Sequence, residues 1–339
     1  MIVKKIPILQ VFPDFDTVKK LSKIHEKKDV SSPVFYDIET TGLSRYSTFL
    51  YLIGAVTCEK EQWVLTQWMA ENPQEEPLIL KEFYDFMQNC SCTVQYNGNR
   101  FGQPYLEERY RINGLSSPFH GIPSLDLYQE LKICQSLLGL SRMKQPDLEA
   151  FLKADKRRYC DGGQCVHLYK MYSKNRDSKL ADTVLGHNFE DLMGLGSIIT
   201  MLGYTALFYG AYKPENAEFH ESSLLFTARL PSALPENISC GNDLFQLTAG
   251  CRDLKLRIPV KEGRIRQYYE NYKDYDYLPE EDMAISHFLS RYMDKSLRIP
   301  ATRETCYTWI ACSGEFLADK EKQAQYLRHS LPCFLKQIK

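Results

Sequence analysis

The sequence predicts an α/β fold in which a mixed sheet has helices on both faces and a mainly antiparallel β unit with a helix follows. Three β-rich segments lie close together between residues 33 and 69, and strand and helix patterns then alternate. After about residue 205, short runs of alternating apolar and polar residues replace them. We therefore expect a lead-in at residues 1–30, a first domain at residues 31–205 and an α+β subdomain at residues 206–339.

The lead-in combines an apolar piece around Ile6 to Phe12 with a charged segment, Lys19 to Lys28, that is expected to form an outer helix. Strand-like segments follow at residues 33–39, Tyr51 to Val56 and Trp63 to Met69. Short spacing between consecutive strands is typical of an antiparallel meander. The sheet is therefore expected to begin with three antiparallel strands.

Strands and helices alternate after the meander. A helix that opens at Pro77 carries an apolar stripe at helical spacing. A fourth strand, Thr93 to Tyr96, leads into a helix from Pro104 to Arg111, and Ser124 to Leu127 forms a fifth strand. The chain from there to Tyr204 is mostly helical. Parallel strands joined by such crossovers place helices on both faces of a sheet.

The pattern changes at about residues 205–215. Alternating runs at Leu224 to Leu230, Leu244 to Thr248 and Leu254 to Ile258 predict antiparallel strands. The segment Leu278 to Asp282 has a proline near its start and acids that would lie at the positive end of a helix dipole, so it predicts the start of a helix.

Composition is that of a globular protein with a core, since 44% of the 339 residues are hydrophobic and 25% are charged. The net charge of −1 gives no general attraction to phosphate, so nucleic-acid binding would depend on local patches. The 11 cysteines, of which Cys160 and Cys165 are a close pair, lack a metal-like pattern and indicate reduced thiols. No leader and no long apolar run is evident, so we expect a soluble, cytoplasmic protein without a membrane partner.

Two carboxylates stand two residues apart at the end of the first strand of the meander. Because side chains alternate along a strand, Asp37 and Glu39 point to the same face. Neighbouring carboxylates repel each other unless a cation lies between them, and hard oxygen ligands suit Mg²⁺ or Mn²⁺. Taken alone, the pair is explained equally well as two solvated acids on an edge strand.

Asp191 interrupts the apolar stripe of a long predicted helix. Val184, Leu195 and Ile198 share its face at helical spacing, so the carboxylate is expected to face the sheet. Burying a lone carboxylate costs several kcal/mol or forces it to take up a proton. A cation shared with the two acids of the first strand would remove this cost.

His187 lies one turn before Asp191, on the same side of the helix. Two structural alternatives stay open. Asp191 can form a buried salt bridge with Arg142 or Lys144, and His187 can be a buried histidine whose hydrogen bonds are satisfied. We interpret Asp126, at the end of the fifth strand, as a structural acid.

Four motifs occur in order: D-I-E-T-T-G-L at residues 37–43, Y-N-G-x-x-F at 96–101, S-L-D-L-Y at 124–128 and H-N-x-x-D at 187–191. Over about residues 30–205, this series resembles the RNase H-like exonucleases of the DEDD superfamily, and most of all the YprB-type RNase H-like domain. The resemblance implies a metal-dependent 3′–5′ exonuclease that hydrolyses phosphodiester bonds of single-stranded DNA or RNA.

The resemblance also implies roles for individual residues. In such enzymes, acids hold two divalent ions about 4 Å apart on either side of the scissile phosphate. Asp37 would contact both Mg²⁺ or Mn²⁺ ions, and Glu39 and Asp191 would complete the first site. His187 would orient or deprotonate the attacking water, which suits a side chain whose pKa is near neutral. The residues expected to contact the substrate are Thr40, Asn97, Gly98 and Phe101.

The second motif departs from the family pattern, which places an aspartate after the phenylalanine to support the second ion. This chain has Gly102 at that position, so it keeps three of the four expected acids and provides securely for one ion. Three interpretations stay open: a weakened exonuclease, a degenerate RNase H-like protein that binds nucleic acid without cutting it, and a protein-interaction module in the C-terminal half. The sequence does not indicate an oligomeric state.

Overall fold

The computed structural model describes residues 1–9, 12–24, 31–159 and 161–338. Residues 25–28 of the predicted outer helix and Cys160 lie outside the described residues. No disulfide joins any of the cysteines within the described part of the chain. The chain divides into two compact units, which are described separately. The first comprises Met1–Lys132 with Arg142–Leu202, and the second comprises Ile133–Ser141 with Gly203–Lys339.

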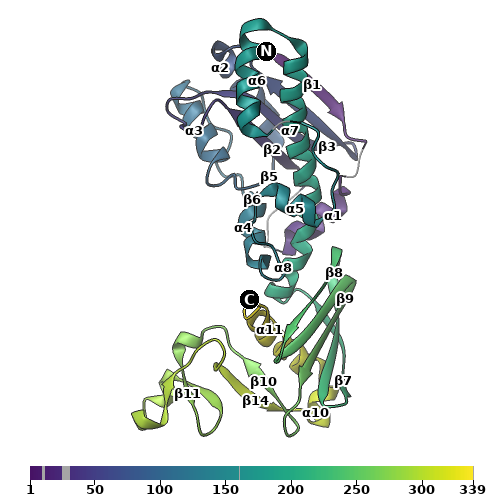
Figure 1. Ribbon diagram of the computed structural model, residues 1–339, viewed down its shortest axis with the longest axis vertical. Coiled ribbons are helices and arrows are strands. Elements are labelled where there is room, and N and C mark those ends of the chain that lie inside the picture. The colour runs from purple at the N-terminus through teal and green to yellow at the C-terminus, as the bar shows by residue number, and fades with distance from the viewer. Residues whose placement is uncertain (10–11, 25–30, 160, 339) are drawn as a thin grey trace. The chain divides into compact units, whose positions relative to one another are not determined.

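A six-stranded mixed sheet forms the centre of the first unit (Figure 1). In spatial order its strands are β1 (Ile2–Pro7), β4 (Gln62–Met69), β3 (Leu50–Glu59), β2 (Pro33–Thr40), β5 (Cys92–Gln95) and β6 (Ser124–Asp126). Neighbouring strands from β1 to β2 are antiparallel, and β2, β5 and β6 are parallel to one another. The predicted fold class is confirmed. The segment expected to be a lead-in supplies the edge strand β1, which the sequence did not predict.

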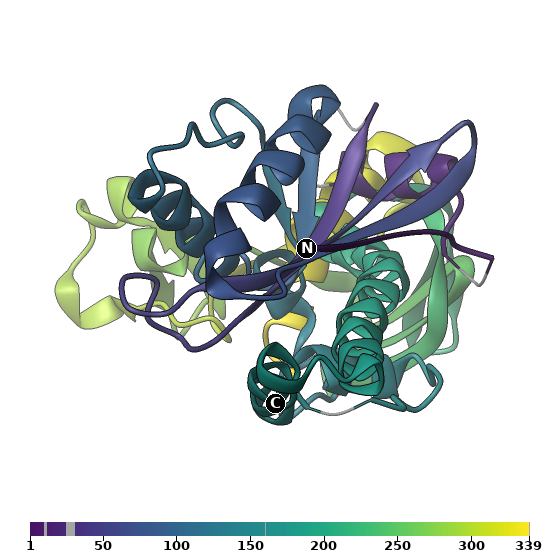
Figure 2. The same ribbon diagram turned by 90° about the horizontal axis from the view of Figure 1, so that it is seen from above.

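Helices cover both faces of this sheet (Figure 2). On one face, α2 (Glu76–Phe86) and α3 (Gly102–Ile112) share an apolar core with Tyr36 and Ile38 of β2. On the other, α6 (Gly162–Asn175) and α7 (Ser178–Ile198) pack on Tyr51 and Leu52 of β3. The shorter helices are α1 (Phe15–Ile24), α4 (Leu127–Leu131) and α5 (Gln145–Phe151). Since side chains alternate along β2, Asp37 and Glu39 lie on the face that α7 covers.

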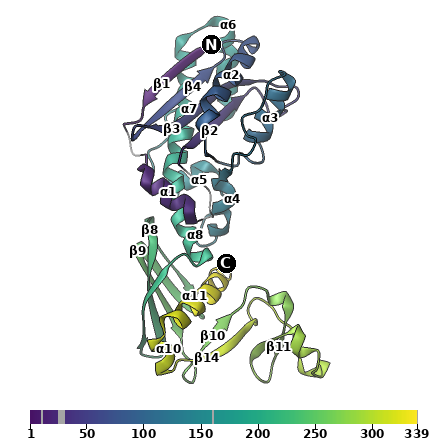
Figure 3. The ribbon, with the colours of Figure 1, turned by 180° about the vertical axis from the view of Figure 1, so that it is seen from behind.

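The second unit contains an antiparallel sheet of β7 (Lys213–His220), β8 (Ser223–Asn242) and β9 (Phe245–Pro259). The long helix α11 (Lys320–Leu335) packs along this sheet (Figure 3). Two stacked aromatic pairs join them: Phe226 with Tyr326, whose ring centroids are 5.3 Å apart, and Phe245 with Phe334, at 5.1 Å. The short helices α8 (Leu202–Tyr209) and α10 (Gly314–Ala318) precede β7 and α11. The predicted antiparallel β unit with a helix is confirmed.

Two small antiparallel sheets complete the second unit. β10 (Arg264–Tyr268) pairs with β14 (Tyr307–Ala311), and β11 (Tyr275–Leu278) pairs with β12 (Met283–Ser286) and β13 (Ile299–Pro300), with α9 (His287–Ser290) after β12. The prediction that a helix starts at Leu278 to Asp282 is wrong, because this segment ends β11 and forms the turn to β12. Asp282 has a left-handed backbone with φ 51° and accepts hydrogen bonds from Tyr277 and Tyr307.

The stretch Ser178–Tyr209 contains a window that is long and apolar enough to cross a membrane by length and composition. The expectation that the chain has no long apolar run is therefore wrong, because the segment from Leu192 to Tyr209 carries no charged residue. Within the structure, 78% of this window is buried. Burial of that extent is typical of a core helix.

Candidate metal centre

Three carboxylates from two elements meet on the sheet face that α7 covers. Asp37 and Glu39 come from the end of β2 and Asp191 comes from the middle of α7, and one oxygen of each lies within 4.8 Å of the others. The helix approaches the sheet closely at Gly54 of β3, which pairs with Asp37. A Cβ atom at Gly54 would lie 1.9 Å from Oδ1 of Asn188. The glycine therefore allows α7 to bring Asp191 to the strand.

Burial and mutual repulsion act on all three acids, since Glu39 is buried and the other two are half-buried. Burial, together with the charge of Asp191, raises the pKa of Asp37 to about 8. Burial and the charges of Asp37 and Asp191 also raise the pKa of Glu39, and burial raises that of Asp191. The Nδ2 group of Asn188 donates to Oδ2 of Asp37 at 3.2 Å. The cluster needs positive charge to hold its acids ionised together.

His187 lies between two of these carboxylates and is only 6% exposed. Its Nε2 atom is 3.4 Å from Oε1 of Glu39 and 3.2 Å from Oδ2 of Asp191. Its Nδ1 atom is buried and has no hydrogen-bond partner among the described residues. His187 is therefore a buried histidine whose Nε2 atom faces two of the acids.

Asp191 has a salt bridge, but neither of the expected partners makes it. Nη1 of Arg157 lies 2.5 Å from Oδ1 of Asp191, whereas Arg142 pairs with Asp147. Arg157 comes from the segment between α5 and α6, which carries no apolar periodicity and joins no motif. No pattern in the sequence singled it out.

The donor set of this centre fits a hard divalent ion. Among the described residues, one further group of side chains could hold a metal, namely Glu39, Cys165 and His187. Cys165 lies within the apolar cluster that contains Tyr51 and Tyr169. Sulfur and nitrogen ligands suit Zn²⁺, whereas three carboxylates suit Mg²⁺ or Mn²⁺. The three carboxylates are the better candidate for a metal site, because their negative oxygens repel one another and the surrounding residues offer too little positive charge to offset this repulsion.

The second motif forms the loop between β5 and α3. Asp126 holds this loop: Oδ1 accepts from the backbone N–H groups of Asn97 at 2.8 Å and Tyr128 at 3.1 Å, and Oδ2 accepts from that of Asn99 at 3.1 Å. Asn97 has φ 54°, which the bond to Asp126 stabilises. The contacts of Asp126 are those of a structural acid. Gly98 follows Asn97 in this loop.

The remaining predicted residues lie around the loop and the end of β2. The Phe101 ring is half-buried and contacts Tyr105, with centroids 5.5 Å apart. The Thr40 hydroxyl donates to the carbonyl of Gly42 at 2.8 Å, so it stabilises its own turn. Gly102 is the first residue of α3, and a Cβ atom there would meet only Oε1 of Gln95, at 4.0 Å. A Cβ atom at position 102 is therefore free of clashes.

Residues 34–202 match the family model of the RNase H superfamily. The matching solved structures include the family B DNA polymerase of the archaeon Pyrobaculum calidifontis, at 12% identity over 91% of this chain and 47% of the polymerase, with a TM-score of 0.41. The chain thus spans about half of the polymerase. Escherichia coli exonuclease I in complex with a dA16 oligonucleotide matches at 15% identity over 90% of this chain and 70% of the exonuclease, with a TM-score of 0.31. No curated protein matches.

Proposed function

Residues 34–202 are an RNase H-like domain, and from this premise we propose that the protein is a metal-dependent 3′–5′ exonuclease acting on single-stranded DNA or RNA. One observation carries the proposal: Asp37, Glu39 and Asp191 converge within 4.8 Å on the face that α7 covers. Buried acids that repel each other are costly to the fold, so their convergence is explained by a ligand that carries positive charge.

The three carboxylates supply the oxygen ligands that Mg²⁺ or Mn²⁺ prefers, one from Asp191 on α7 and two from β2. A divalent ion held there would polarise a phosphate oxygen and lower the pKa of a water molecule. Asn188 orients Asp37 through its hydrogen bond to Oδ2. The rigid strand and helix thus fix all three acids before the substrate arrives.

His187 is the group that would take a proton from the attacking water. The positions of Glu39 and Asp191, 3.4 and 3.2 Å from Nε2, hold the ring beside the acids. An imidazole can accept a proton near neutral pH and return it to solvent. Phe101, half-buried at the start of α3, would lie under a base of the strand.

A second candidate function is that of a binding protein that does not cut nucleic acid. Two observations favour it, namely Gly102 in place of an acid and the ion pair that Arg157 forms with Asp191. Gly102 removes negative charge that would hold a second ion, and Arg157 neutralises part of the charge of Asp191, which would hold the first. We therefore expect slow cleavage at most, so the assay must detect single-turnover rates.

The test uses the full chain with single-stranded DNA and RNA oligonucleotides labelled at either end. With Mn²⁺, a 5′ label should give a ladder of shortened products and a 3′ label should be released at once as a mononucleotide. EDTA and the substitution Asp37→Ala should each abolish the products. Cleavage that persists in Asp37→Ala comes from a contaminant. Binding in EDTA without any cleavage in Mn²⁺ would favour the second candidate.

A further inference from the structure

Arg157 is the cation closest to the carboxylates among the described residues, and its guanidinium is shared between two acids. Nε and Nη2 donate to Oε2 and Oε1 of Glu149 at 2.8 and 2.7 Å, and Nη1 donates to Oδ1 of Asp191 at 2.5 Å. Burial lowers the pKa of Arg157, but Glu149 and Asp191 raise it by more, so the pKa lies above its ordinary value. The side chain is therefore a permanent positive charge beside the acids.

The segment that carries Arg157 is anchored to α7 on both sides of His187. The Glu190 carboxylate accepts from the backbone N–H groups of Arg158 at 2.6 Å and Tyr159 at 3.2 Å. The Tyr159 ring packs directly on Gly186, where a Cβ atom would lie 2.2 Å from the ring. These anchors, with the bidentate bond to Glu149, fix the position of the guanidinium.

The guanidinium keeps donors for a further partner. An arginine has five N–H bonds in a planar fork, and three of them are used by Glu149 and Asp191. Two remain, one on each terminal nitrogen, and the side chain is 23% exposed. Each remaining N–H bond can donate to a phosphate oxygen, which is a strong hydrogen bond because both groups are charged.

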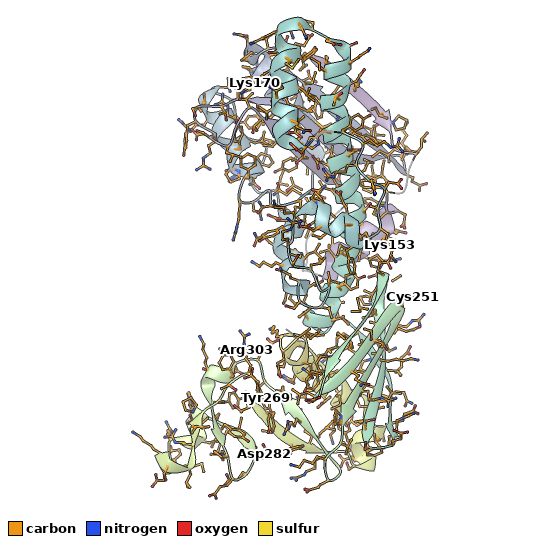
Figure 4. All side chains as sticks on the ribbon, in the orientation of Figure 1. Lys153, Lys170, Cys251, Tyr269, Asp282 and Arg303 are labelled. Carbon is orange, nitrogen blue, oxygen red and sulfur yellow. The ribbon has the colours of Figure 1, made fainter. Side chains whose placement is uncertain are left out.

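The same segment presents further positive charge to solvent. Lys153, labelled in Figure 4, Lys156 and Arg158 are exposed, and Asp155 is the only acid between them. This segment would attract the phosphates of a single strand that enters the site. Its local basic residues supply an attraction that the net charge of −1 does not.

We propose that Arg157 binds the substrate phosphate beside the three carboxylates and supplies positive charge that a second metal ion would supply if position 102 were acidic. This inference rests on the proposed function and adds a residue to its site. Arg157 and a metal ion compete for the negative charge of Asp191, since each is a cation that this carboxylate would bind. Removing the guanidinium should therefore weaken phosphate binding and, at the same time, strengthen metal binding.

These opposite changes can be measured without cleavage. Calorimetry would give the affinity of the full chain for Mn²⁺, and then the affinity of the Mn²⁺-loaded protein for thymidine 5′-monophosphate. Arg157→Gln should lower the nucleotide affinity about tenfold or more, because a hydrogen bond to a charged group is lost. Its Mn²⁺ affinity should rise. Arg157→Lys, which keeps the charge but lacks the fork, should lie between the wild type and Arg157→Gln in nucleotide affinity.

Arg109→Gln is the matched control. Arg109 makes the same bidentate contact through Nε and Nη2, at 2.7 and 2.6 Å, with Glu76 on the opposite face of the sheet. Arg109→Gln should leave the affinities for Mn²⁺ and for the nucleotide unchanged when they are measured below the unfolding temperature of each variant. If Arg157→Gln fails to fold, Arg157→Lys carries the test alone.

Equal nucleotide affinity in the Mn²⁺-loaded wild type and Arg157 variants would overturn the role of Arg157 but not the metal centre. A parallel loss of Mn²⁺ and nucleotide affinity would also overturn it, because Arg157 would then only position Asp191. A wild-type protein that binds no Mn²⁺ would overturn both the proposed function and this inference.

Discussion

Buried acids in the two units of this protein differ in the direction of their pKa shifts. In the first unit, burial and repulsion raise the pKa values of Asp37 and Glu39. In the second unit, burial also raises the pKa of Asp276, but hydrogen bonds from Ser290 and Arg298 outweigh it and hold the value below the ordinary range. The difference lies in the donors around each acid.

The acids of the second unit are paired with donors from their own unit. Asp276 accepts from Ser290 at 2.5 Å and from Arg298, and Asp282 accepts from Tyr277 at 2.6 Å and from Tyr307. Asp37 and Glu39 in the first unit have fewer such donors and more negative neighbours. The comparison teaches that burial alone does not mark a functional acid, whereas burial without enough donors indicates a place for an external cation.

The largest expected effect sharpens this comparison at Asp37. Asp37→Asn should lower the Mn²⁺-dependent cleavage rate by roughly three orders of magnitude or more, since a ligand of the ion is worth several kcal/mol. The same change should raise the thermal midpoint of the metal-free protein at pH 8, because it removes a repelling charge. Added Mn²⁺ should stabilise the wild type but not the variant.

The pH dependence of the Asp37→Asn comparison follows from the raised pKa. An acid whose pKa is raised on folding stabilises the folded state least when it is ionised. The pKa of Asp37 is about 4 in the unfolded chain and about 8 in the folded one. The wild type therefore loses stability as the pH rises between these two values. The metal-free variant should lack this loss, and the two thermal midpoints should converge near pH 4. Equal midpoints at pH 8 would contradict the repulsion.

An intermediate effect, opposite in sign, is expected at Asp276. Asp276→Asn should destabilise the second unit by about 2 kcal/mol, because it leaves the half-buried Arg298 without its charged partner. A depressed pKa contributes stability above the unfolded value of about 4, and this contribution is lost as the pH falls through the folded pKa. The deficit of the variant should therefore shrink in acid, as urea titrations at several pH values would show.

Asp243→Asn provides the control for this change, since Asp243 is an exposed acid in the same unit. It should leave the free energy of unfolding within about 0.5 kcal/mol of the wild type. Neither Asp276→Asn nor Asp243→Asn should change the cleavage rate at a temperature where all variants are folded. A stabilising effect of Asp276→Asn would break the comparison, because it would show that the donors fail to compensate for burial.

Most of the fold could be predicted because its elements have strong periodicities. The alternation in β2 put Asp37 and Glu39 on one face, and the helical stripe put Asp191 on the face of α7 that meets the sheet. The roles of these residues, and of His187, stay predictions. The edge strand β1 was missed because it is half exposed, with charged residues at Lys4 and Lys5.

Features that depend on tertiary contacts could not be predicted. Arg157 meets Asp191 across 34 residues of chain, and only the folded positions of α5 and α7 bring them together. The turn at Asp282 has the composition of a helix start, but tyrosines from β11 and β14 capture its carboxylate. Local sequence carries no sign of Arg157 or Tyr307 as a partner, because each is far along the chain from the acid that it contacts.

The smallest expected effect tests the missing acid directly. Gly102→Asp should raise the Mn²⁺-dependent cleavage rate about tenfold, because it restores a carboxylate where the family pattern has one and charge on the second ion is worth at least about 1.4 kcal/mol. The new Cβ would contact only Gln95 and the backbone needs no left-handed conformation, so the fold should tolerate the change. Gly314→Asp is the matched control, since Gly314 also begins a helix and a Cβ atom there would meet no neighbour. A rate that stays at background in Gly102→Asp would count against an enzymatic role for the centre and would favour a protein that binds nucleic acid without cutting it.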